Sequence, residues 1–134
     1  MWKCPKCNRE FAKENQSHSC VKYPLEEHFR NKENQRKFFD TYIDFVRKNV
    51  GDFKIEAMPC CIHLVGTYTF SAVWILKDKM RIDFMLPEKL SNARITKIAQ
   101  PSTNRYVHYL EVVDERDFDD ELVNWLKKAY FLKS

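Results

Sequence analysis

Four side chains suited to binding zinc lie within the first 20 residues of the chain. Cys4 and Cys7 are separated by two residues, and His18 and Cys20 complete the pattern C-x2-C-x10-H-x-C. Zinc prefers thiolate and imidazole ligands in a tetrahedron, and two cysteines at this spacing hold one edge of it in a tight turn. Because the protein would fill all four positions, we expect one structural zinc ion (Zn2+) per chain.

The residues around these ligands are typical of a small zinc knuckle. Trp2 and Phe11 stand where aromatic side chains supply most of the apolar contacts of such modules. Asn8 follows the second cysteine, where a left-handed backbone is common and asparagine tolerates it well. We therefore assign residues 1–23 to a zinc-knuckle module and 24–134 to a second domain.

A second group of soft donors, Cys60, Cys61 and His63, lies in the middle of the chain. In a strand, Cys61 and His63 share a face. They could form a second metal site completed by His28 or His108. Alternatively, a cysteine nucleophile could use His63 or His108 as its base. The commonest role of such a cysteine is that of a small buried apolar side chain.

His108 and Arg105 belong to the aromatic stretch RYVHY. A strand of this kind could bind a base, a peptide or a small anion on one face. The ordinary role of a histidine there is a hydrogen-bonded residue at the edge of the core. The candidate ligand-binding residues are therefore His108, Arg105, His63 and Cys61.

The elements that must position these residues follow from the hydrophobic periodicity. Leu25 to Arg30 predicts a short helical turn, and apolar residues at three- and four-residue spacing predict a helix from Glu33 to Gly51. Alternating patterns predict strands over 53–57, 60–65, 67–76, 80–86, 94–99 and 105–113. The acidic cluster near residue 117 is suited to a helix N-terminus, so a last helix is expected there.

The order helix, strands, helix predicts an α+β fold. We expect the small N-terminal zinc knuckle to be followed by a mainly antiparallel sheet packed against helices. In the strand over 67–76, we expect one face to consist of Tyr68, Phe70, Ala72, Trp74 and Leu76.

Composition excludes several classes of function. Of 134 residues, 44% are hydrophobic and 14% aromatic, which is enough for a packed core. With two glycines, the chain lacks the glycine-rich loops that bind nucleotide phosphates, so we expect no nucleotide cofactor. No apolar run approaches the roughly 20 residues that cross a bilayer, so we expect no membrane partner. The start has no secretory signal pattern, and five cysteines fit metal ligands better than disulfides, which predicts a cytoplasmic protein.

Three stretches resemble a known family: "MWKCPKCNREF…NQSHSC", "LEEHF" and "NRYVHYLEV…DFDDELVNWLKKAY". They are similar to the bacterial family named domain of unknown function 5655, here with a zinc knuckle in front. The resemblance covers nearly the whole chain. It implies a small α+β domain and carries no activity over to this sequence.

The zinc-finger-like start of the chain and its positive charge favour nucleic acid over protein as a binding partner. The net charge is +4, and residues 1–24 hold five lysine and arginine side chains against two carboxylates. Zinc-bound thiolates reduce that excess. We therefore expect a zinc-stabilised binding module with weak affinity for nucleic acid. The alternatives are a protein-interaction module, or an enzyme using His108 or His63 with a cysteine.

Overall fold

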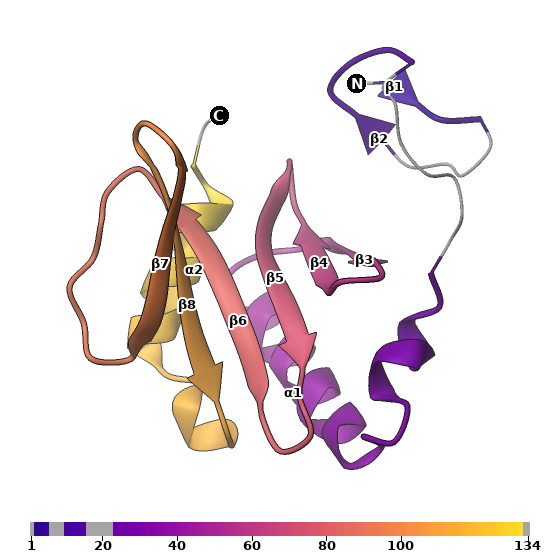
Figure 1. Cartoon of the computed structure of the whole chain (residues 1–134), viewed down its shortest axis with the longest axis vertical. Coiled ribbons are helices and arrows are strands. Elements are labelled where there is room, and N and C mark those ends of the chain that lie inside the picture. Colours follow the sequence, from indigo (N-terminus) through magenta and orange to yellow (C-terminus); the bar gives the residue numbers. More distant parts are fainter. Residues whose placement is uncertain (1, 6–9, 16–22, 133–134) are drawn as a thin grey trace.

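The chain forms an α+β protein, which confirms the expected fold class (Figure 1). The structure is a computed structural model, and it describes residues 2–5, 10–15 and 23–132. These residues contain a six-stranded sheet, a two-stranded sheet, two α-helices and two short 3₁₀ helices. No helix in the described ranges has the length and apolar character needed to cross a membrane.

The large sheet is antiparallel throughout, with the strand order β3-β4-β5-β6-β8-β7. Its strands are β3 (Lys54–Ala57), β4 (Ile62–Val65), β5 (Thr69–Ile75), β6 (Met80–Leu86), β7 (Ile95–Ser102) and β8 (Arg105–Val112). Tight connections join β3 to β4, β4 to β5, β5 to β6 and β7 to β8. The longer segment 87–94 carries the chain from β6 to the edge strand β7.

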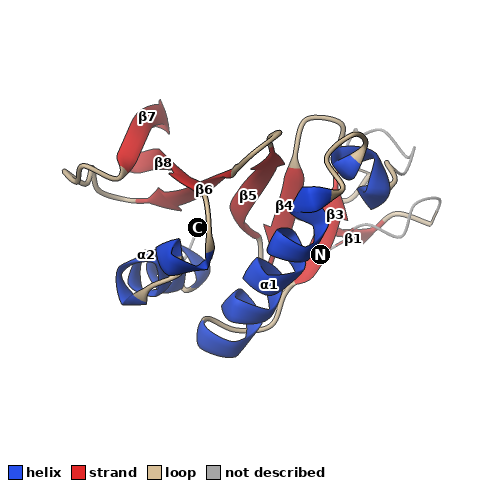
Figure 2. Ribbon diagram, turned by 90° about the horizontal axis from the view of Figure 1, so that it is seen from below, coloured by secondary structure: helices blue, strands red, loops and turns tan. Residues whose placement is uncertain are grey.

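Both α-helices lie against the same face of the sheet (Figure 2). They are α1 (Asn34–Asn49) and α2 (Asp120–Tyr130), preceded by the 3₁₀ helices η1 (Leu25–Phe29) and η2 (Glu115–Asp117). Their apolar stripes and one face of β4, β5, β6 and β8 form a single buried core. An antiparallel sheet needs cover on one side only. The opposite face, which neither α-helix covers, is called the open face below.

Phe118, just before α2, connects the two helices. Its ring lies 5.2 Å from Phe38, 5.3 Å from Phe45 and 5.2 Å from Tyr42, all on α1. Aromatic pairs at this separation add about 0.5–1.5 kcal/mol each beyond their burial. The wide apolar stripe of α1 therefore serves two neighbours, the sheet and the segment that leads into α2.

A β-bulge interrupts β5 next to β4. Leu64 is paired with Ser71, but the next residue, Val65, is paired with Thr69, so the register skips Phe70. At a bulge, two residues of one strand lie opposite one residue of the other, and the alternation of faces is broken. Phe70 and Ser71 are both buried for this reason.

The bulge turns Phe70 towards α2 and away from the open face. Its ring makes edge contacts with Phe53 at 5.7 Å and with Tyr130 at 5.0 Å. The expectation that Phe70 shares a face with Ala72 and Trp74 is therefore wrong. Simple alternation along the sequence cannot detect a bulge, because the bulge depends on the pairing with the neighbouring strand.

Tyr130 at the end of α2 packs between the two glycines of the chain. A β-carbon at Gly51 would lie 2.8 Å from the Tyr130 ring, and one at Gly66 would lie 3.0 Å from it. Its hydroxyl donates a hydrogen bond to the carbonyl of Asp52 at 2.6 Å. Glycine at both positions thus lets the helix end approach the β3 and β4 side of the sheet.

The described part of the N-terminal segment contains the strands β1 (Trp2–Lys3) and β2 (Glu10–Phe11). They pair antiparallel, with Trp2 opposite Phe11. Cys4 is 3% exposed, whereas the other expected zinc ligands, Cys7, His18 and Cys20, lie outside the described residues. The zinc knuckle therefore remains a prediction.

Candidate metal centre and open sheet face

The two strand histidines, His63 and His108, lie on opposite faces of the sheet. His63 is aligned with Ala72, and Ala72 with Asp83. His108 is aligned with Phe84, the residue after Asp83. Because consecutive strand residues point to opposite faces, His63 is on the open face and His108 faces the helices. The structure does not bring together the two histidines that the enzyme alternative invokes.

His108 is a fully buried core residue. Its Nε2 accepts a hydrogen bond from the Leu90 amide at 3.0 Å, and its ring stacks on Phe84 with centroids 5.1 Å apart. Burial lowers its pKa, although nearby backbone groups of β6 and β8 partly offset this. Arg105, three residues earlier on β8, belongs to the other face, so His108 and Arg105 do not share a site.

A row of six cross-strand neighbours crosses the open face. From β3 to β7 it contains Glu56, His63, Ala72, Asp83, Tyr109 and Lys97. Asp83 Oδ1 accepts a hydrogen bond from the Ala72 amide at 2.7 Å. Burial raises the pKa of Asp83 to about 7, against the lowering effect of this bond. Near neutral pH this carboxyl group is therefore protonated in a large fraction of molecules.

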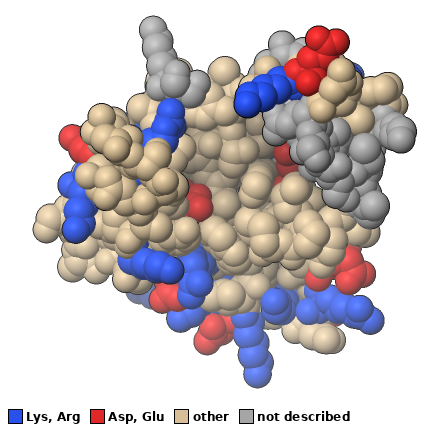
Figure 3. All heavy atoms as spheres, turned by 45° about the horizontal axis from the view of Figure 1, so that its top comes forward, with Lys and Arg blue, Asp and Glu red and all other residues tan. Residues whose placement is uncertain are grey.

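Trp74 and Tyr109 lie side by side on the open face and are both partly exposed. Their ring centroids are 5.8 Å apart, and Lys97 Nζ lies 5.8 Å from the Tyr109 centroid. Beside them Glu111 forms ion pairs with Lys79 at 3.2 Å and Arg81 at 3.8 Å. The centre of this side of the molecule is hollowed and carries few charges, and lysine and arginine side chains, with carboxylates among them, lie mainly along its lower and left edges (Figure 3).

Cys60, Cys61 and His63 form a compact cluster at the turn between β3 and β4. One donor atom from each lies within 4.8 Å of the other two, and the two sulfurs are 3.0 Å apart. The Met58 amide donates to the Cys61 carbonyl at 2.9 Å, which closes the turn. Cys60 is exposed, Cys61 is 2% exposed and His63 is partly buried. The structure thus gathers the second group of soft donors that the sequence indicated.

The protonation of Cys61 and His63 does not suit a catalytic role for the buried cysteine. Burial, together with smaller effects of the neighbouring Cys60 and Asp83, raises the pKa of the Cys61 thiol to about 12. Burial lowers the pKa of His63, and the Glu56 carboxylate opposes this change. A nucleophilic cysteine needs a thiolate stabilised by a cationic neighbour, and here the thiol and the imidazole are both neutral. Neutral thiol and imidazole groups remain capable of binding a metal, which displaces the thiol protons.

Sequence reasoning identified this cluster but missed its acidic neighbours on the same face, Glu56 and Asp83. Alternation within 80–86 places Asp83 outward together with Arg81. Which residues lie beside Asp83 depends on pairing with β5 and β8, which local patterns do not report. No spacing motif in the sequence connects Glu56 with His63.

The fold and the cluster together define the class of protein. It is a small α+β protein whose antiparallel sheet is covered by helices on one face and carries cysteine and histidine side chains at one turn. A family model described as Domain of unknown function (DUF5655) matches residues 25–133, and the chain belongs to this family. The match begins after the N-terminal segment with the expected zinc ligands. Comparison with curated proteins and with solved structures gave no match.

Proposed function

We propose that the protein is a zinc-stabilised binding module whose open sheet face binds single-stranded nucleic acid. The observation that carries the proposal is the pair Trp74 and Tyr109, adjacent and partly exposed on a face that neither α-helix covers. Bases of single strands stack on such aromatic side chains, and each stack contributes about 1–3 kcal/mol. Sheet faces with aromatic side chains are a recurring platform for RNA and single-stranded DNA.

Charge on the open face is compatible with a phosphate backbone. Lys97 and Arg81 are exposed beside the aromatic pair. Of the three carboxylates there, Glu111 is already paired with cations, and Asp83 is partly neutral because its pKa is raised to about 7. The third, Glu56, lies on β3 at the far edge of the sheet, with three strands between it and the strand of Tyr109. With a net charge of +4 for the whole chain, we expect weak binding that falls steeply with salt.

In this proposal the zinc ion has a structural role. Cys4, Cys7, His18 and Cys20 hold it, and it orders a segment whose cations Lys3, Lys6, Arg9 and Lys13 add phosphate contacts. Two features of the described residues support the knuckle: Cys4 is buried, and Trp2 lies opposite Phe11 in the β1–β2 pair. Reduced thiols at these positions fit a cytoplasmic protein.

The test is the binding of a fluorescently labelled oligonucleotide, of about 12 nucleotides so that it can span one sheet face. Anisotropy at low salt should show binding by the wild-type protein. Trp74→Ala should weaken it by about tenfold, the loss expected for one base stack. Phe131→Ala is the matched control, since Phe131 is 67% exposed but lies beyond α2 and off the open face. Its affinity should equal that of the wild type.

The dependence on salt separates stacking from charge. Trp74→Ala removes no cation, so its plot of log affinity against log salt should keep the wild-type slope. Equal weakening by Trp74→Ala and Phe131→Ala would contradict stacking on the open face. Absence of binding to both single- and double-stranded oligonucleotides at low salt would reject a nucleic acid partner. A protein partner would then be the better hypothesis.

A further inference from the structure

We infer that Cys60, Cys61 and His63 form a second metal site, for a thiophilic cation such as Zn2+ or Cu+. It lies at the β3–β4 turn, and its donors are separate from the four expected in the N-terminal segment. The inference goes beyond the proposed function, which assigns a metal to the N-terminal knuckle alone. It rests on the gathering of three soft donors from the turn and the start of β4.

The distances between the donor atoms are close to those of a metal site and require only small adjustments to bind an ion. Zn–S bonds of about 2.3 Å and Zn–N bonds of about 2.0 Å in a tetrahedron place the donors roughly 3.5–3.8 Å apart. The cluster has its sulfurs at 3.0 Å and all three donor atoms within 4.8 Å. On binding, the two sulfurs must therefore move apart by about 0.5–0.8 Å, and donor pairs at up to 4.8 Å must approach by at most about 1.3 Å. Rotation of the Cys60 side chain can supply much of this adjustment, because that side chain is exposed.

Strand pairing holds the backbone of His63, and a hydrogen bond of the turn holds that of Cys61. His63 belongs to β4, which is paired on both sides, and the hydrogen bond from Met58 to Cys61 closes the turn before it. The backbone of His63, the donor on a paired strand, therefore loses little conformational freedom when the site binds a metal. Such rigidity raises the affinity of a site.

Glu56 is placed to orient the imidazole. It is the cross-strand partner of His63 on β3, and its carboxylate acts on the charge of that ring. Metal-binding histidines usually donate their second ring N–H to a carboxylate or carbonyl, which fixes the ring and raises its basicity. We therefore infer that Glu56 positions the His63 ring. The metal is bound by Cys60, Cys61 and His63.

The charge of the site and its access to solvent are suited to a metal ion that exchanges with solution. When Zn2+ binds, both thiols lose a proton to solvent, and two thiolates then neutralise the ion in a half-buried site. With three protein ligands, the fourth position remains open to water or a ligand. Because Cys60 is exposed, an ion can enter and leave from its side. We expect this site to bind more weakly than the closed four-ligand knuckle.

The test uses the full chain, reduced and purified, with Zn2+ measured by equilibrium dialysis and Co2+ as a spectroscopic probe. The wild type should bind two zinc ions. Cys60→Ser with His63→Gln should bind one, as should the matched control Cys4→Ser with Cys7→Ser. Combining all four changes should abolish binding. Both Cys60→Ser and His63→Gln leave the buried Cys61 in place, and far-ultraviolet circular dichroism checks that the fold persists.

Co2+ titration of the Cys4→Ser, Cys7→Ser protein isolates the inferred site. Thiolate-to-cobalt absorption should appear, and it should be lost after Cys60→Ser. Glu56→Gln should keep the spectrum but weaken affinity by about 10–100-fold, as expected for a residue that acts through a ligand. Retention of two zinc ions by the Cys60→Ser, His63→Gln protein would overturn the inference. So would a Cys4→Ser, Cys7→Ser protein that binds no cobalt through thiolate.

Discussion

At the scale of single residues, His108 shows how burial fixes a protonation state. Its Nε2 accepts the hydrogen bond from Leu90, so that nitrogen carries no proton in the folded protein. Protonation would replace this bond with a contact between two donors inside the core. Burial also removes the water that would stabilise the charged ring, and this desolvation lowers the pKa of His108. In the unfolded chain the same side chain has its ordinary pKa of about 6.5.

We predict that His108 makes the fold less stable in acid. Below about pH 6.5 the unfolded chain binds a proton at this position and the folded protein does not, so the free energy of unfolding falls as pH falls. The slope from one such proton is at most about 1.4 kcal/mol per pH unit. His108→Gln keeps an acceptor for the Leu90 amide but cannot titrate. Urea unfolding between pH 7.5 and 5 should show a steeper loss for the wild type than for this variant.

The comparison with His108→Gln is needed because Asp83 changes the free energy of unfolding in the opposite direction as pH falls. Its pKa is raised to about 7, so the folded protein binds its proton more readily than the unfolded chain. Acidification from pH 7 towards 4 therefore stabilises the fold at Asp83. The difference between the two proteins removes this contribution and those of His28 and His63. Parallel curves for both proteins would show that His108 does not titrate differently on unfolding.

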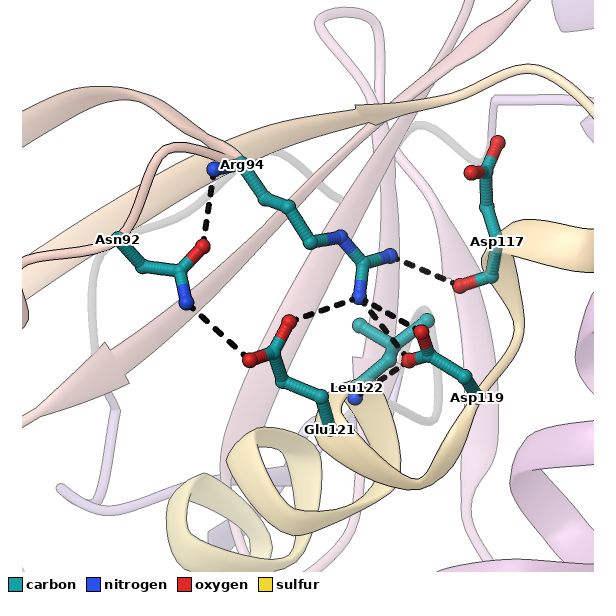
Figure 4. A network of polar contacts seen from close by, with 6 residues as sticks. All are labelled: Asn92, Arg94, Asp117, Asp119, Glu121 and Leu122. Atoms are coloured by element: carbon teal, nitrogen blue, oxygen red, sulfur yellow. Dashed lines mark hydrogen bonds and ion pairs between the residues drawn. The ribbon is translucent and has the colours of Figure 1, made fainter.

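At the scale of elements, Arg94 joins the β6–β7 connection to the start of α2 (Figure 4). Its guanidinium donates to both carboxylate oxygens of Asp119 at 2.9 and 3.1 Å, to Glu121 at 3.1 Å and to the Asp117 carbonyl at 2.9 Å. Asp119 also caps α2 by accepting a hydrogen bond from the Leu122 amide at 3.0 Å. One planar cation thus holds the capping carboxylate in place.

We predict that Arg94→Lys lowers the free energy of unfolding by about 1 kcal/mol. Lysine keeps the charge but loses the planar fork and its several simultaneous donors. The ion pair itself contributes little, since the Arg94 and Asp119 side chains are 26% and 48% exposed. Arg116→Lys is the matched control, because its pair with Asp114 has an arginine side chain that is 92% exposed. Urea unfolding that gives equal values for both variants would contradict the assigned role of Arg94.

At the scale of the whole molecule, an exposed ion pair links the N-terminal segment to the α+β domain. The Glu10 and Lys54 side chains form an ion pair at 3.6 Å between β2 and β3, and both are exposed. Such a pair contributes at most about 1 kcal/mol. Of the N-terminal residues whose side chains the structure describes, neither Trp2 nor Cys4 belongs to the core of the large sheet. The two parts are therefore expected to unfold independently.

We predict that removal of the metal unfolds the first 20 or so residues and leaves the large sheet intact. A small zinc module owes roughly 10 kcal/mol or more of its folding free energy to the metal. After chelation, amide hydrogen exchange should rise in residues 1–23 while β5, β6 and β8 stay protected. Cys4→Ser with Cys7→Ser should reproduce this pattern without a chelator. Loss of protection throughout β5, β6 and β8 would show that the two parts fold as one.

The sequence by itself determined the elements of this protein and the donors capable of binding metal. Hydrophobic periodicity is a local property, and it predicted α1, α2 and the strands, including the outward position of Asp83. It ended one strand at Ala99, whereas β7 continues through Pro101 to Ser102, because an edge strand tolerates proline.

Only the tertiary structure decided which side chains meet. Strand alternation assigns a residue to one of two faces, but the pairing register decides its neighbours, and register depends on residues far apart in the sequence. That is why His63 and His108 lie on opposite faces, although both belong to apolar stretches predicted to be strands. For the same reason, Trp74 and Tyr109 lie side by side. It is also why Phe70 was misplaced: a bulge arises between two strands, and neither strand encodes it alone.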